Sequence, residues 1–137
     1  MSEIIYKEHA SPEEIDIILE GIIHESVKKD MGRMTPFSFF IKEEDRILAG
    51  AVGYTMYGML YTDMLWVHPE FRNLGYGSRL LKAAEELGKN RNCTFSCLVT
   101  MSWEALPLYQ KLGYYIEYTK EGFNKNTQMY MLRKPLT

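Results

Sequence analysis

Residues 65–81 read Leu65-Trp66-Val67-His68-Pro69-Glu70-Phe71-Arg72-Asn73-Leu74-Gly75-Tyr76-Gly77-Ser78-Arg79-Leu80-Leu81. This stretch predicts the end of a strand, a loop and the beginning of a helix. Strand-favouring residues end at Val67, Pro69 stops strand pairing, and helical spacing of apolar residues begins after Gly77. The first N–H groups of a helix lack partners within it, and the helix dipole adds partial positive charge there. Glycine lets the backbone approach a ligand closely. The stretch therefore predicts a pyrophosphate site, with Arg72 as a counter-charge.

Two other phosphate-binding loops share this physics but need different residues. The run Gly75-Tyr76-Gly77-Ser78-Arg79-Leu80 lacks the third glycine of a dinucleotide fingerprint. It also lacks the Gly-Lys-Ser/Thr of a nucleotide-binding P-loop. A plain strand-to-helix turn with no ligand remains the alternative that the glycines alone leave open.

Outward from this stretch, apolar spacing and turn residues predict an alternation of strands and helices. Ser11, Pro12 and Glu14 form the capping signal of the first helix. The strand before Gly58 and the strand after it are expected to form an antiparallel hairpin, and the two later helices are expected to connect parallel strands. The fold class is α/β, with a mixed, mostly antiparallel sheet flanked by helices. The predicted strands are 3–8, 37–42, 47–57, 60–67, 94–100, 114–118 and 128–134, and the helices are 11 to about 30, 77–89 and 103–112.

The composition limits the function classes. A chain of 137 residues with 46% apolar and 25% charged residues predicts a single globular domain over residues 1–137. The net charge is −2 and no basic run is present, so nucleic-acid binding is not expected. No apolar run is long enough for a membrane span, and the N-terminus does not resemble a secretion signal. Cys93 and Cys97 lie four apart on a predicted strand, too distant for a disulfide with each other, and unpaired thiols favour the cytoplasm.

Two segments of the chain resemble a known family. Arg72-Asn73-Leu74-Gly75-Tyr76-Gly77 is similar to the Arg/Gln-x-x-Gly-x-Gly/Ala signature of the GNAT superfamily of acyl-CoA N-acyltransferases. The strand that ends at Val67 resembles the fourth strand of that fold, and residues 105–114 resemble its second recurring segment, a short helix followed by Gly and an aromatic residue. The resemblance implies that the fourth and fifth strands splay apart and that acetyl-CoA threads the gap, with no metal required.

The resemblance also assigns the cofactor contacts. The backbone of Leu65, Trp66 and Val67 would pair with the pantetheine arm in the manner of an added strand. Many relatives carry Asn where this chain has Ser102, so the pantetheine contact of Ser102 departs from the family pattern. The backbone amides that would hold the pyrophosphate belong to Arg72, Asn73, Leu74, Gly75, Tyr76, Gly77 and Ser78.

Direct acetyl transfer needs an acid, a base and an oxyanion donor. Tyr109 occupies the position that resembles the family's catalytic tyrosine, and its phenol could protonate the leaving thiolate; a packing aromatic is the alternative. Asp63 shares strand parity with Tyr61, Leu65 and Val67, and could act as base through a water or bind the cationic amine. Glu104 is the rival base, and a solvated acid in the first turn of a helix is its alternative. The oxyanion donor is expected to be a backbone N–H near Val67, where the strand is expected to bulge.

Further expectations concern metal binding, the acceptor amine and the oligomeric state. His68 precedes a proline in a turn, which favours an outward, structural role, and the three histidines show no metal-ligand spacing. The acceptor is expected to be a small-molecule or peptide amine, and a non-catalytic acyl-CoA-binding module is the alternative function. An apolar edge at residues 128–132 predicts a homodimer. The aromatic residues expected to wall an acceptor pocket are Phe37, Tyr57, Tyr61, Trp103 and Tyr118.

Overall fold

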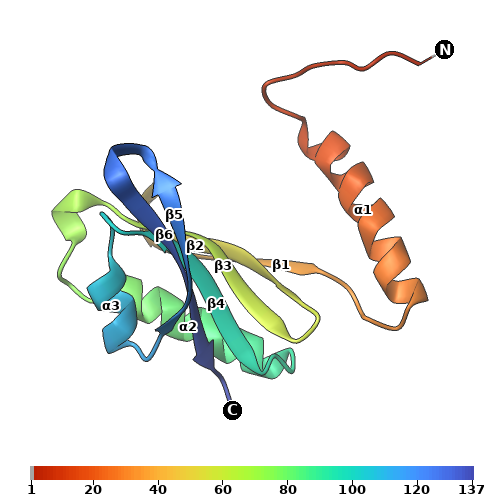
Figure 1. The fold of residues 1–137 in the computed structure, drawn as a ribbon. Helices are drawn as coiled ribbons and strands as arrows, with labels where there is room; N and C mark the ends of the chain where they lie inside the picture. Colours follow the sequence, from red (N-terminus) through yellow and green to blue (C-terminus); the bar gives the residue numbers. More distant parts are fainter. Residues whose placement is uncertain (1) are drawn as a thin grey trace. The chain divides into compact units, whose positions relative to one another are not determined.

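A computed structural model describes residues 2–137, which divide into two compact units, an N-terminal one that ends at Arg33 and a second one over Met34–Thr137 (Figure 1). None of the helices in the described part of the chain is long and apolar enough to cross a membrane.

The N-terminal unit consists of an extended segment and helix α1, Pro12–Lys28. Its first turn is closed by the predicted capping box, in which Ser11 Oγ accepts from the Glu14 N–H and Glu14 Oε1 accepts from the Ser11 N–H. The strand predicted at residues 3–8 is wrong, because these residues form no strand. Their composition suits a strand, but a strand exists only through pairing with a neighbour, which composition does not specify.

The second unit is built on one six-stranded sheet in the order β1-β2-β3-β4-β6-β5 (Figure 1). Helix α2, Tyr76–Asn90, and helix α3, Leu106–Lys111, contribute to one core cluster with the sheet, so both pack on the same face of it. Two short 3-10 turns, Pro69–Phe71 and Asn124–Asn126, lie in the connections. The strands are β1 Thr35–Glu43, β2 Arg46–Met56, β3 Met59–Val67, β4 Phe95–Met101, β5 Tyr115–Phe123 and β6 Thr127–Pro135.

The pairing of the strands confirms one connection and corrects another. β2 and β3 form the predicted antiparallel hairpin, and β3 pairs with β4 in parallel through the α2 crossover. The second expected parallel pairing is wrong, because β6 lies between β4 and β5 and is antiparallel to both. The hairpin of β5 and β6 therefore places residues 128–132 inside the sheet, and β5 forms the edge instead.

The splay between the predicted fourth and fifth strands is confirmed; these strands are β3 and β4, since residues 2–34 form no strand. Their ladder joins Met59–Thr62 to Phe95–Leu98 and goes no further, so residues 63–67 have no β4 partner. A bulge at Asp63 interrupts the β2–β3 register, where Val52 pairs with Met64 and Gly53 with Thr62. Such an extra residue bends and twists the strand that carries it, which turns the rest of β3 away from β4.

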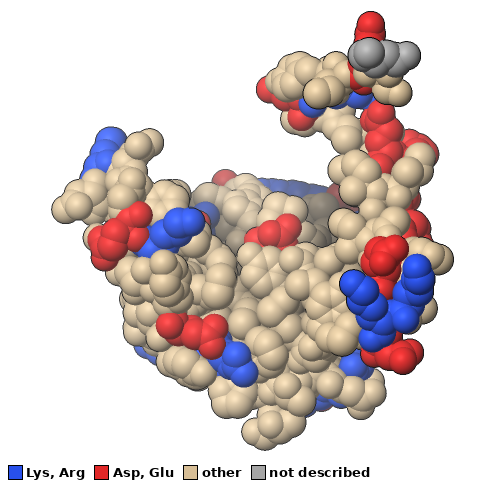
Figure 2. All heavy atoms as spheres, turned by 45° about the vertical axis from the view of Figure 1, so that its right-hand side comes forward, with Lys and Arg blue, Asp and Glu red and all other residues tan. Residues whose placement is uncertain are grey.

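The side chains of the second unit agree with the sequence in two respects. Cys93 and Cys97 are both free, as predicted, and both are buried. On the face drawn in Figure 2, Lys and Arg side chains lie among Asp and Glu side chains rather than in one field, in keeping with a net charge of −2.

Candidate functional site

The loop that follows β3 ends at an uncapped helix. Gly75 is the N-cap of α2 and has a left-handed φ of 82°, which glycine adopts without strain. The first hydrogen bond of the helix runs from the Arg79 N–H to the Gly75 carbonyl at 3.0 Å, and no side chain caps this end. The N–H groups of Tyr76, Gly77 and Ser78 therefore lack helical partners and carry the positive end of the dipole. This end of α2 can bind a phosphate without any side chain.

Aromatic and cationic side chains on and beside this loop stack on one another. Phe71 stacks on Tyr76, with ring centroids 6.4 Å apart and planes 12° apart. The guanidinium of Arg46 lies over Phe71 at 5.3 Å from the ring centroid, and that of Arg79 lies over Tyr76 at 5.7 Å. Stacking of this kind holds the amides of the loop in place before any ligand arrives.

Arg72 is tied to the end of β3, since its Nε donates to the Val67 carbonyl at 3.0 Å. This bond holds the guanidinium beside the loop, which is compatible with a counter-charge to phosphate. Gly77 has a packing role that the sequence did not indicate. A Cβ built on Gly77 would lie 3.5 Å from Leu108 Cδ2 and 3.9 Å from Val67 Cγ2. A long or charged side chain at residue 77 would therefore disturb the contact of α2 with α3 and β3.

The opening between β3 and β4 begins at the pair Thr62–Leu98. Leu65 and Val67 pack towards the core cluster of Ala49, Ala51 and Leu80, whereas Trp66 is 47% exposed. Because Leu65, Trp66 and Val67 have no β4 partner, their backbone edge on that side can accept an extended ligand. The Val67 carbonyl already accepts from Arg72.

A buried hydroxyl lies where the opening begins. Thr62 is 4% exposed, and its Oγ1 is the one fully buried side-chain oxygen or nitrogen without a hydrogen-bond partner among residues 2–137. A buried polar group without a partner costs free energy, so such an atom often belongs to a binding site. The strand edge without a partner therefore begins beside an unsatisfied hydroxyl at Thr62 and ends at Val67, near the uncapped end of α2.

Asp63 is the bulge residue of β3, and this corrects two predictions. The bulge was expected near Val67, but Val67 pairs regularly with Ala49. The parity expected for Asp63 with Leu65 and Val67 is wrong as well, because the extra residue shifts the alternation after Asp63, whereas Tyr61, before the bulge, lies beside it. Leu60 and Thr62 are buried before the bulge and Leu65 and Val67 lie towards the core after it.

The carboxylate of Asp63 is exposed and lies beside two tyrosines. The rings of Tyr54 and Tyr61 are 5.3 Å apart across β2 and β3. Burial raises the pKa of both phenols, and the Asp63 carboxylate raises the pKa of each further. An open cleft of about 680 Å³ is lined by Asp63 and Tyr54, together with Pro36, Phe37, Ser38, Phe39, Val52, Gly53, Leu87 and Arg91. Of the five aromatic residues expected to wall a pocket, only Phe37 lines this cleft.

Tyr54 is the residue of this cleft that sequence reasoning missed. Its position was predictable in principle, because it faces Tyr61 in the β2–β3 register. Both residues lie between the turn at Tyr57-Gly58 and the bulge at Asp63, so a count of residues back from the turn pairs them.

Tyr109 lies in α3 with 8% of its surface exposed, against Leu81 and Leu98. Burial raises the pKa of its phenol, and the Glu104 carboxylate raises it further, so the hydroxyl stays protonated at neutral pH. The hydrogen bonds of the described residues include none from this hydroxyl. The residue therefore carries a proton that no other side chain uses.

Three other predicted site residues have structural partners. Ser102 Oγ accepts from the Gln128 N–H at 3.0 Å, which fastens the end of β4 to β6. Glu104 Oε1 accepts from the Met101 N–H at 2.8 Å and closes the turn before α3. His68 Nδ1 accepts from the Glu70 N–H, in agreement with its predicted structural role. Among residues 2–137, no cluster of three metal-ligating side chains occurs.

Comparison with known proteins identifies the family. The family model described as Acetyltransferase (GNAT) family matches residues 4–114. The chain belongs to the GNAT acetyltransferase family. This GNAT chain is 33% identical to an acetyltransferase of Agrobacterium fabrum over 91 residues, which cover 66% of this chain and 62% of that relative. It is 30% identical to the blasticidin-S acetyltransferase of Streptomyces morookaense over 95 residues, which cover 69% of this chain and 70% of that protein.

A solved structure agrees over nearly the full length. The crystal structure of an acetyltransferase from Bacillus cereus matches this GNAT chain with a TM-score of 0.75 and 26% identity. That match covers 96% of this chain and 97% of the other. The GNAT chain spans about 62% of the length of its Agrobacterium relative. This partial match does not by itself assign the activity of a relative to the chain.

Proposed function

We propose that this protein is an N-acetyltransferase that moves an acetyl group from acetyl-CoA to a primary amine. The observation that carries the proposal is the adjacency of two features on one stretch of chain. The strand edge opened by the splay of β3 and β4 leads through a short loop to the uncapped N-terminus of α2. This arrangement fits a long ligand whose amide-bearing arm lies along the strand edge and whose pyrophosphate lies at the helix N-terminus.

The residues present fit acetyl-CoA as follows. The backbone of Leu65, Trp66 and Val67 pairs with the pantetheine arm, and the amides of residues 72–78 hold the pyrophosphate. Arg72 stays beside the phosphates through its bond to the Val67 carbonyl. The hydroxyl of Ser102 accepts from Gln128, so its own proton remains free to donate to the pantetheine arm. The unsatisfied Thr62 hydroxyl supports a ligand group at the inner end of the opening.

The acceptor amine enters from the cleft beside Asp63. An exposed carboxylate next to Tyr54 and Tyr61 suits an ammonium group, through ion pairing and through the aromatic faces. Asp63 then either holds the cation or takes its proton through a water. A relative named as a blasticidin-S acetyltransferase supports a small-molecule amine as acceptor, and a peptide amine is the second candidate.

The chemistry uses one proton acceptor and one proton donor. The neutral amine attacks the thioester carbonyl carbon, and backbone N–H groups beside the bulge at Asp63 stabilise the developing oxyanion. The carbon–sulfur bond breaks, and the thiolate takes the proton of Tyr109. The amine proton leaves through Asp63 or water, and the phenol is reprotonated from solvent. The products are the N-acetylated amine and coenzyme A.

An acceptor screen tests the proposal. Acetyl-CoA is mixed with a panel of polyamines, amino acids, cationic antibiotics and peptides, thiol release is followed, and product mass is measured. Amine-dependent thiol release with an added acetyl group on the amine is expected. Acetyl-CoA binding by calorimetry without amine-dependent release across the panel would support the alternative, a non-catalytic acyl-CoA-binding module.

We also propose that the protein forms a homodimer through the edge strand β5. Tyr115, Ile116 and Tyr118 on this strand are exposed by 50%, 38% and 57%, and its outer backbone edge has no neighbour in the sheet. Light scattering at micromolar concentration should give the dimer mass, and Ile116→Lys should shift it towards the monomer. A monomer mass for the unaltered protein contradicts the proposal.

A further inference from the structure

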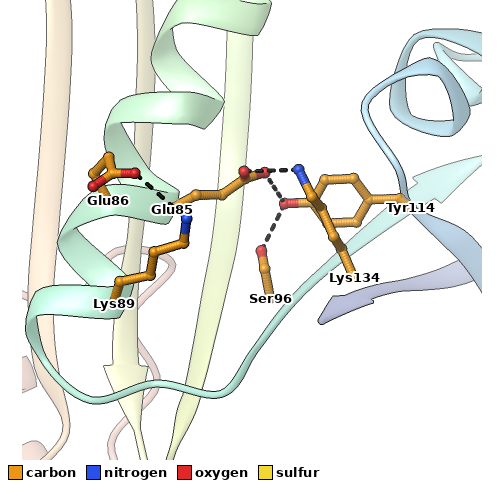
Figure 3. Close-up of polar contacts among 6 residues, drawn as sticks. All are labelled: Glu85, Glu86, Lys89, Ser96, Tyr114 and Lys134. Atoms are coloured by element: carbon orange, nitrogen blue, oxygen red, sulfur yellow. Dashed lines mark hydrogen bonds and ion pairs between the residues drawn. The ribbon is translucent and has the colours of Figure 1, made fainter. Parts of the chain in front are cut away.

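A buried polar network joins one helix, two strands and the residue just before β5 in the second unit (Figure 3), next to Tyr109. It consists of Glu85 on α2, Ser96 on β4, Tyr114 just before β5 and Lys134 on β6. Ser96 is 0%, Tyr114 3% and Glu85 7% exposed. Buried polar groups that are fully satisfied fix the geometry of the elements that carry them.

Each of the four side chains in the network has a hydrogen-bond partner within it. The Tyr114 hydroxyl donates to Glu85 Oε2 at 2.9 Å, so the Ser96 hydroxyl donates to Tyr114 across 2.7 Å. Lys134 Nζ donates to Glu85 Oε1 at 2.8 Å, which neutralises the buried carboxylate. Figure 3 shows the phenol of Tyr114 between Ser96 and the Glu85 carboxylate. The Tyr114 ring is therefore held at its outer end by two hydrogen bonds from different elements.

The hydrogen bond from Tyr114 to Glu85 persists at ordinary pH. Burial raises the pKa of the Tyr114 phenol far above its usual value, and the Glu85 carboxylate raises it further, although the Ser96 hydroxyl lowers it. Tyr114 therefore remains a hydrogen-bond donor at any pH at which the protein is assayed.

Tyr114 contacts Tyr109 through both ring and backbone. The two ring centroids lie 6.3 Å apart with the planes at 74°, an edge-to-face arrangement. The Tyr114 N–H also donates to the Tyr109 carbonyl at 3.0 Å. Gly113, with a φ of 99°, turns the chain between them so that both contacts can form.

Helix α3 depends on such contacts for its orientation. It has six residues, and no side chain caps its N-terminus at Ala105. A helix this short has no independent stability in water, so tertiary contacts decide where its side chains lie. Among these contacts, those of Tyr114 reach Tyr109 directly.

We propose that Tyr114, anchored by Glu85, is a positioning residue that sets the orientation of the Tyr109 hydroxyl towards the reacting thioester. The inference rests on the proposed function, in which Tyr109 protonates the leaving thiolate. A displacement of a catalytic group by about 1 Å can cost about a hundredfold in rate. Loss of the anchor should therefore reduce turnover while leaving the cofactor site, which lies on β3 and α2, intact.

The direct variant is Tyr114→Phe, which removes the anchoring hydroxyl and keeps the ring against Tyr109. We expect kcat to fall between about tenfold and a hundredfold, with KM for acetyl-CoA changed less than about threefold. Tyr6→Phe is the control for the loss of one phenolic hydroxyl, because Tyr6 is 85% exposed, lies in the N-terminal unit and belongs neither to the network nor to the proposed dimer edge. An unchanged kcat in Tyr114→Phe overturns the inference.

A double-mutant cycle separates positioning from general stability. If Tyr114 acts through Tyr109, then Tyr109→Phe with Tyr114→Phe should have the kcat of Tyr109→Phe alone. If the two losses multiply, Tyr114 acts independently of Tyr109 and the inference is wrong, while the acid role of Tyr109 stands. If Tyr109→Phe alone leaves kcat unchanged, the acid role falls and the inference falls with it.

Glu85 offers a second route if Tyr114→Phe does not fold. Glu85→Gln keeps an oxygen that can accept from Tyr114, whereas Glu85→Ala removes it. Rescue of kcat in Glu85→Gln relative to Glu85→Ala, among folded proteins of similar acetyl-CoA KM, supports the anchor. Equal kcat in the two variants contradicts it.

Discussion

At Tyr109, burial and a neighbouring carboxylate act in the same direction. Both raise the pKa of the phenol, burial first and Glu104 second, which keeps the proton available for a leaving thiolate. The phenol can act as an acid only while it is protonated. In our proposal kcat therefore falls as pH rises through the Tyr109 pKa, above the ordinary tyrosine value of about 10.

Glu104→Gln tests this electrostatic coupling. The amide oxygen can still accept from the Met101 N–H, so the turn before α3 should persist. Removal of the negative charge removes one cause that raises the Tyr109 pKa, so the alkaline limb of the kcat profile should move to lower pH. The measurement is a kcat–pH profile of both proteins. A limb that stays in place or moves to higher pH refutes the coupling.

At Asp63, the proposal concerns the acceptor rather than acetyl-CoA. Asp63→Asn removes the charge beside Tyr54 and Tyr61 with little change in shape. KM for a cationic acceptor should rise by up to about fivefold, since an exposed ion pair contributes about 0.2–1 kcal/mol.

Asp45→Asn, in the turn between β1 and β2, is the matched control for the same loss of charge. The measurement is steady-state kinetics with each substrate varied in turn. Unchanged acceptor KM and kcat in Asp63→Asn, or an equal effect in both variants, rules out a role of Asp63 in the site.

The close pairing of β2 and β3 depends on Gly53, where there is no room for a side chain. A Cβ on Gly53 would lie 2.0 Å from the Tyr61 carbonyl oxygen and 2.9 Å from Phe37 Cε2. Gly53→Ala should therefore force β2 and β3 apart next to the bulge and lower the free energy of unfolding by more than about 3 kcal/mol.

Gly50→Ala, on the same strand, is the control for Gly53→Ala. The atom nearest to a Cβ built on Gly50 would be 3.2 Å away, in the ring of the half-exposed Phe40. Denaturant unfolding should show a small change for Gly50→Ala. Similar midpoints for Gly53→Ala and the unaltered protein contradict the structural role assigned to Gly53.

The elements near the phosphate loop were readable from the sequence because local rules determine them. Helix α2 and the strand before it follow from periodicity, Pro69 and the glycines, and α1 follows from its capping box. The splay of β3 and β4 came from family resemblance. Its bulge at Asp63 was misplaced to Val67, because nothing in strand composition marks where an extra residue is inserted.

Long-range pairing was the part that the sequence could not specify. The insertion of β6 between β4 and β5 depends on which edge a hairpin joins, and local spacing does not carry that choice. The same holds for the network of Glu85, Ser96, Tyr114 and Lys134. Its members come from α2, β4, β6 and the connection before β5, and the only local indication was the Gly113-Tyr114 pair after α3.

In the second unit as a whole, three elements converge on one proposed ligand. The open edge of β3 would hold its extended arm, the N-terminus of α2 would hold its phosphates, and α3 would present Tyr109 to its reactive end. The arrangement has a clear consequence for binding, because the α2 end supplies only backbone N–H groups and a dipole. A negative charge added at that end should oppose the phosphates directly.

The central claim is therefore tested most directly by acetyl-CoA titration calorimetry on Gly75→Asp and Gly75→Asn. Apart from its neighbours along the chain, no heavy atom lies within 4 Å of a Cβ built on Gly75, and Asp and Asn both tolerate its left-handed φ of 82° better than other side chains do. The two variants have nearly the same shape and differ in charge. We predict that Gly75→Asp binds acetyl-CoA at least about tenfold more weakly than Gly75→Asn, a difference of about 1.4 kcal/mol. Equal affinities in the two folded variants would contradict a phosphate site at the N-terminus of α2.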